Sequence, residues 1–64
     1  MTYKIMDGGF CVDKGLVLLH DAQNKAEDYC RESDVDTISI INEETGETVL
    51  TGHAVFSMNW EGKQ

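Results

Sequence analysis

Apolar and polar residues alternate at positions 3–5 and again at 10–12, and a glycine-rich turn separates the two segments. A two-residue period is typical of strands that bury one face, so this stretch predicts a β-hairpin. A two-residue loop at Asp7-Gly8 would place the apolar side chains of both strands on one face. These side chains are Tyr3, Ile5, Phe10 and Val12, with Ile5 opposite Phe10 and Tyr3 opposite Val12.

A second turn is predicted at Asp13-Lys14-Gly15, where the glycine suits a backbone conformation with positive φ. The apolar run Leu16-Val17-Leu18-Leu19 follows directly. Its length and composition fit either a short buried strand or a segment that leads into a helix, and the sequence leaves both alternatives open.

Residues 21–33 change to a helical period. Asp21 is a favourable N-cap residue, because its carboxylate can accept hydrogen bonds from backbone N–H groups of the first turn. One face carries Ala22, Ala26, Tyr29, Cys30 and Ser33. The opposite face carries Asn24, Glu27, Asp28, Arg31 and Glu32. The pattern therefore predicts one amphipathic helix, about 21–33, whose small residues pack closely against a sheet.

The C-terminal half of the chain predicts three strands. Residues 37–41 are rich in β-branched side chains, and residues 43–46 have the composition of a hairpin turn, so 47–51 is expected to return antiparallel. Gly52 is expected to end that strand, and residues 53–60 alternate again as a final strand.

The order of these elements predicts an α+β fold in a single domain, residues 1–64. Two strands, an optional third strand and the helix are followed by three strands (β-β-(β)-α-β-β-β), and the helix packs on a small antiparallel sheet. One register stays open, because the length of the second hairpin turn decides whether Ile40 faces Leu50 or Val49.

Length and net charge exclude several classes of function. Sixty-four residues leave no room for a cofactor-binding βαβ pair, a barrel or a cleft between two domains. Hydrophobic residues make up 41% of the chain and charged residues 27%, which is typical of a globular protein. The net charge of -7 opposes binding to nucleic-acid phosphates and to anionic membranes. We expect neither a membrane span nor a signal peptide, and therefore a cytoplasmic location.

The chain carries few residues of the kinds that catalysis or metal binding requires. Its cysteines and histidines are Cys11, His20, Cys30 and His53, and their separations of 9, 10 and 23 residues differ from the close ligand pairs of structural zinc sites. Neither cysteine lies at the predicted helix N-terminus, where the pKa of a thiol falls. We therefore expect reduced thiols, no bound metal or cofactor, and no enzymatic activity.

The acidic residues are unevenly distributed along the chain. Between residues 21 and 47 nine acidic side chains face two basic ones, so the whole net charge of -7 falls within this segment. Two interpretations stay open: the charge keeps a small domain soluble, or it forms a face that binds a basic partner. The candidate partner-binding residues are Asp21, Asp28, Glu32, Asp34, Asp36, Glu43, Glu44 and Glu47.

In size, α+β layout and charge, the whole chain resembles the small acidic proteins that bacteriophages encode to disable host enzymes, including inhibitors of host RNA polymerase and anti-CRISPR proteins. The resemblance implies a non-catalytic inhibitor of phage or mobile-element origin that acts in the host cytoplasm. Its partner would be the basic surface of a host nucleic-acid-handling protein, such as an RNA polymerase, a nuclease or a CRISPR effector, which the domain would occupy as a DNA mimic. No functional residue is carried over, because the resemblance rests on no shared motif.

An alternative hypothesis uses the terminal strand, where the side chains of Phe56, Met58 and Trp60 alternate with polar residues. A small sheet has exposed edges, and an edge strand can pair with a second copy of the chain. On this hypothesis the protein is a self-associating accessory domain that forms a homodimer.

Overall fold

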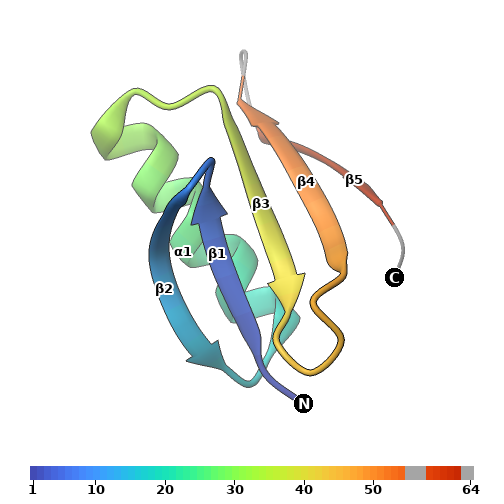
Figure 1. Ribbon diagram of the computed structural model, residues 1–64. Helices are drawn as coiled ribbons and strands as arrows, with labels where there is room; N and C mark the ends of the chain where they lie inside the picture. The colour runs from blue at the N-terminus through green and yellow to red at the C-terminus, as the bar shows by residue number, and fades with distance from the viewer. Residues whose placement is uncertain (55–57, 63–64) are drawn as a thin grey trace.

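The computed structural model describes residues 1–54 and 58–62, the side chain of Met58 excepted. Within these residues the elements are β1 (Tyr3–Asp7), β2 (Phe10–Leu16), α1 (Leu19–Ser33), β3 (Thr37–Asn42), β4 (Thr48–Ala54) and β5 (Met58–Gly62). The strands form one antiparallel sheet in the order β2-β1-β3-β4-β5, and α1 crosses one face of it (Figure 1). The predicted α+β fold is therefore confirmed.

The core lies between α1 and the sheet, and its residues come from one face of each. Four aliphatic side chains from three strands are fully buried, namely Ile5, Ile38, Ile40 and Leu50. The helix meets them with Ala22, Ala26 and Cys30, which recur at every fourth position. Because these helix side chains are small, the helix backbone can approach the sheet closely, and the larger strand side chains fill the space between the layers.

The helix begins two residues earlier than predicted. Leu18 is the N-cap, with an extended backbone, and its carbonyl oxygen accepts a hydrogen bond from the backbone N–H of Ala22 at 3.1 Å. Asp21, the expected N-cap, lies instead within the first turn, where the positive end of the helix dipole still favours a carboxylate. The predicted C-terminal end at Ser33 agrees with the structure.

The β1–β2 hairpin turns one residue later than predicted. The turn consists of Gly8 and Gly9, and Asp7 pairs with Phe10 across it. Gly8 has a φ of 59°, the left-handed conformation that two-residue hairpin turns require and that glycine adopts without strain.

The predicted partners of Ile5 and Tyr3 in this hairpin are also wrong. The observed pairs are Tyr3–Leu16, Ile5–Asp13, Met6–Cys11 and Asp7–Phe10, with two register irregularities between them. β2 continues through residues 13–15, so the predicted turn is instead part of an irregular strand. Because β2 ends at Leu16, the apolar run 16–19 leads into the helix.

The β3–β4 pairing settles the open register, since Ile40 lies opposite Leu50. Gly52 was expected to end the strand, but β4 continues through it to Ala54 and pairs there with β5. Gly52 is buried and lies directly opposite Trp60, which packs against the core. The strand continues through Gly52 because the residue is paired on both sides, with Ile38 of β3 and Trp60 of β5.

The packing at Ala26 gives a test of the two-layer core. Ala26 is 0% exposed, so Ala26→Asp would place an unpaired carboxylate between α1 and the sheet. A domain of this length has a stability of only about 3–5 kcal/mol, so we expect the variant to be unfolded by circular dichroism. Asn24→Asp adds the same charge on the exposed face of the helix and should fold normally. A folded Ala26→Asp variant would contradict this helix register.

Candidate functional site

All eight predicted partner-binding carboxylates are exposed, but the fold places three of them at each of two ends of the molecule and the other two along the helix. Glu32, Asp34 and Asp36 lie where α1 ends and β3 begins, whereas Glu43 and its neighbours lie on the loop between β3 and β4. Asp36 and Glu43 flank β3, and at about 3.3 Å per residue their backbones are roughly 20 Å apart. This separation exceeds the Debye length of about 8 Å at physiological ionic strength, so the two ends act as separate charged surfaces.

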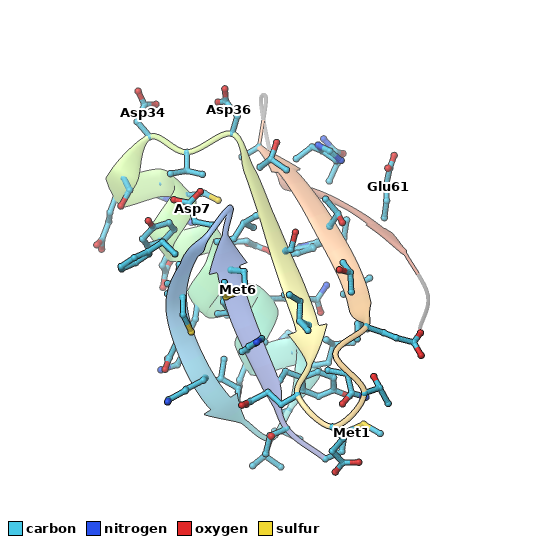
Figure 2. The ribbon with its side chains drawn as sticks, viewed as in Figure 1. Met1, Met6, Asp7, Asp34, Asp36 and Glu61 are labelled. Atoms are coloured by element: carbon cyan, nitrogen blue, oxygen red, sulfur yellow. The ribbon has the colours of Figure 1, made fainter. Side chains whose placement is uncertain are left out.

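The carboxylates at the end of α1 form a group that we call the helix-end cluster: Asp7, Glu32, Asp34 and Asp36. Figure 2 shows Asp7, Asp34 and Asp36 at the same end of the sheet, with Asp7 contributed by the last position of β1. Among the described residues, no lysine, arginine or histidine nitrogen lies within 4.0 Å of any of these four carboxylates. The cluster is therefore a concentration of negative charge that the described part of the fold does not neutralise.

Asp34 occupies the position at which α1 stops. It has a φ of 55° and a ψ of 44°, and its backbone N–H donates a hydrogen bond to the carbonyl oxygen of Cys30. Glycine or asparagine is the usual residue in this left-handed capping conformation. The negative end of the helix dipole further destabilises each nearby carboxylate by about 0.3–1 kcal/mol. Asp34 is thus locally unfavourable for both conformation and charge.

Two side chains beside the cluster respond to its charge. The Tyr29 hydroxyl donates a hydrogen bond to Asp7 Oδ2 at 2.9 Å, and this bond, with burial and the charge of Asp7, raises the pKa of the phenol. Burial raises the pKa of the Cys30 thiol, and the charges of Asp7 and Asp36 raise it further. Cys30 is therefore held as a thiol, which opposes a role as a nucleophile.

The carboxylates at the opposite end have partners within the fold. Glu43 Oε1 accepts a hydrogen bond from the backbone N–H of Gly15 at 2.7 Å. Glu44 Oε1 lies 3.0 Å from the N-terminal ammonium of Met1. These contacts tie the β3–β4 loop to β2 and to the start of β1. Glu43 and Glu44 therefore have a structural role at this end that Glu32, Asp34 and Asp36 lack.

Two more of the predicted residues lie along the helix. Asp28 forms an ion pair with Arg31, 3.1 Å between the charged atoms, and Asp21 lies in the first turn. Asp7 belongs to the helix-end cluster but was not among the partner-binding residues predicted from the sequence. Nothing in the local pattern around Asp7 signals its role, because only the pairing of β1 with its neighbours brings it to the end of α1.

The residues considered for metal or redox chemistry do not converge. Cys11 is exposed on β2, Cys30 lies on the buried face of α1, and both are free thiols. In the described part of the chain, no group of three or more histidine, cysteine, aspartate or glutamate side chains is placed to hold a metal ion. The described helix is also too short and too polar to cross a membrane.

The terminal strand presents Trp60 inward. The indole is half-buried, and its Nε1–H donates a hydrogen bond to Glu27 Oε2 at 3.2 Å. Of its two predicted companions in self-association, Phe56 lies outside the described residues and Met58 lies in β5 with its side chain outside the description. β5 is an edge strand of the sheet, so within the described residues a strand pairs with only one side of its backbone.

No protein-family model matches the chain, and no curated protein or solved structure is significantly similar to it.

The Tyr29–Asp7 hydrogen bond predicts an alkaline titration. In a Tyr3→Phe background Tyr29 is the only tyrosine, and its phenol should ionise above the ordinary value of about 10. The raised pKa stabilises the fold below pH 10, and this contribution is lost as the pH rises through the folded pKa. Asp7→Asn keeps an acceptor but removes the charge, so it should lower the midpoint measured by phenolate absorbance. Equal midpoints with and without Asp7→Asn would contradict the contact.

Proposed function

We propose that the protein is a non-catalytic acidic binding module that engages the basic surface of a nucleic-acid-handling protein and inhibits it. The helix-end cluster is the observation that carries this proposal. In this cluster Asp34 has a left-handed backbone conformation, and the carboxylates lie at the negative end of the helix dipole. Among the described residues no cation neutralises them. Locally unfavourable residues tend to be kept where another role requires them.

The chemistry of the partner follows from the charge. With a net charge of -7 the domain attracts basic surfaces and is repelled by nucleic acid itself. Basic grooves are characteristic of proteins that bind nucleic-acid phosphates. An acidic domain in such a groove would compete with DNA or RNA, and this is the mode of action that the resemblance to small phage-encoded inhibitors implies. Host cytoplasm is the compartment in which such an inhibitor would act.

Self-association through the terminal strand is the second candidate. The edge position of β5 favours it, since an edge strand can accept a further strand through its backbone. The net charge opposes it, because two copies that each carry -7 repel one another. The inward position of Trp60 also leaves less of its indole available to a second copy.

Two triple variants test whether the helix-end cluster contacts a partner. E32Q/D34N/D36N removes three charges at the end of α1, and E43Q/E44Q/E47Q removes three charges at the β3–β4 loop. A basic nucleic-acid enzyme captured from nuclease-treated bacterial lysate at low salt, and lost at high salt, provides the partner for binding kinetics. We expect the first variant to slow association by about tenfold and the second to have a smaller effect, since both change the overall charge equally.

Stability separates this result from a folding defect. Because E32Q/D34N/D36N relieves the helix dipole, it should raise the free energy of unfolding by roughly 0.5–1 kcal/mol while it weakens binding. Equal losses from both triple variants would show attraction by overall charge without a contact at the helix end. Capture of no basic protein, together with self-association in sedimentation experiments, would favour the second candidate.

A further inference from the structure

Three large apolar side chains are exposed at the end of the molecule opposite the helix-end cluster. Met1 is 67% exposed, Val17 is 68% exposed and Leu18 is 58% exposed. We call these three residues the apolar patch. Large apolar side chains that gather on the surface of a small protein mark an interaction site more often than side chains scattered singly.

The register of the sheet brings the three residues to one end. Tyr3 lies opposite Leu16, so the residues just before β1 and those just after β2 lie at the same end of these two strands. Figure 1 shows the N-terminus and the connection from β2 to α1 at this end, and Figure 2 shows Met1 there. The patch therefore combines the start of the chain with the segment that enters the helix.

Leu18 is unfavourable where it stands. It occupies the N-cap position, yet no side-chain hydrogen bond caps the helix. Serine, threonine, aspartate or asparagine at an N-cap stabilises a helix by about 0.5–2 kcal/mol relative to an apolar residue. The leucine side chain cannot form this capping hydrogen bond, and more than half of its surface is exposed to solvent. Neither the helix nor the core accounts for a leucine at this position.

Carboxylates border the patch. Glu44 contacts the ammonium of Met1 at 3.0 Å, and Glu43 contacts the backbone of Gly15, two residues before Val17, at 2.7 Å. Asp21 follows Leu18 by three residues in the first turn of the helix. Glu47 lies on the same loop as Glu43 and Glu44. Among the described residues, Asp21, Glu43 and Glu47 have no lysine, arginine or histidine nitrogen within 4.0 Å, so their charges are available to a partner.

We propose that the apolar patch with its acidic rim is a docking surface for a basic amphipathic segment of another protein. Leucine-like side chains of that segment would cover Val17 and Leu18, and its lysine or arginine side chains would pair with the rim. A second copy of this chain fits poorly, because a symmetric contact would bring two acidic rims together. An anionic membrane is repelled for the same reason. The inference goes beyond the charge-driven contact at the helix end, since it assigns a separate surface with an apolar centre.

The test uses apolar substitutions that leave every charge unchanged. The probe is a synthetic amphipathic peptide of leucine and lysine, and its control is a peptide with the same lysines and serine in place of leucine. We expect V17S/L18S to weaken binding of the leucine–lysine peptide by at least about tenfold in calorimetric titrations. Phe10→Ser removes a side chain that is 60% exposed on β2 at the other end, and it should change the affinity by less than about twofold.

Thermal unfolding shows whether V17S/L18S remains folded. Because Leu18→Ser supplies the missing N-cap, we expect the double variant to unfold at a temperature equal to or higher than that of the parent. Unchanged peptide affinity in V17S/L18S, or an equal loss in Phe10→Ser, would overturn the proposal. A parent dimer in sedimentation equilibrium that V17S/L18S converts to monomer would also overturn it, since the patch would then belong to a second copy. Because E32Q/D34N/D36N leaves the patch intact, failure here is separate from failure of the proposed function.

Discussion

The close contact between the small-residue face of α1 and the four buried aliphatic side chains of the sheet determines where every other feature lies. Ala22, Ala26 and Cys30 let the helix backbone approach β1 and β3, and the described part of the fold has no element beyond this helix and this sheet to compensate if the contact is lost. A helix fixed in this way has both of its ends fixed as well. The C-terminal end meets the start of β3, and the N-terminal end meets the connection from β2.

The two charged ends follow from that geometry. β3 starts beside the end of α1 and finishes at the β3–β4 loop, so acidic residues that are near in sequence are separated by the length of a strand. The two groups of carboxylates also differ in their contacts. Glu43 and Glu44 contact Gly15 and the Met1 ammonium, whereas no carboxylate of the helix-end cluster forms an ion pair among the described residues. The molecule therefore presents two surfaces of different chemistry, one purely acidic and one acidic around an apolar centre.

The sequence predicts the elements better than their boundaries, for physical reasons. The small residues of α1 and the β-branched run of β3 carry a strong local period, and the structure confirms both. Leu19 packs against the core as the first residue of the helix, so the N-cap is Leu18 and not Asp21. Gly52 lies inside a strand because β4 pairs with a strand on each side, β3 at Ile38 and β5 at Trp60, and a local sequence signal for a break does not include this pairing. Exposure of the eight candidate carboxylates was predictable from their polarity, but the addition of Asp7 to the helix-end cluster depends on strand pairing.

The helix does not hold all parts of the sheet equally. It packs mainly on β1, β2 and β3, while β5 is joined to the rest through its ladder with β4 and through Trp60, which packs against the core and donates a hydrogen bond to Glu27. We therefore expect local stability to fall from the central strands, which the helix covers, toward β5 at the edge of the sheet. On this expectation β5 detaches at a lower free energy than global unfolding requires, and the packing of α1 on β1, β2 and β3, which positions both charged ends, stays assembled when it does.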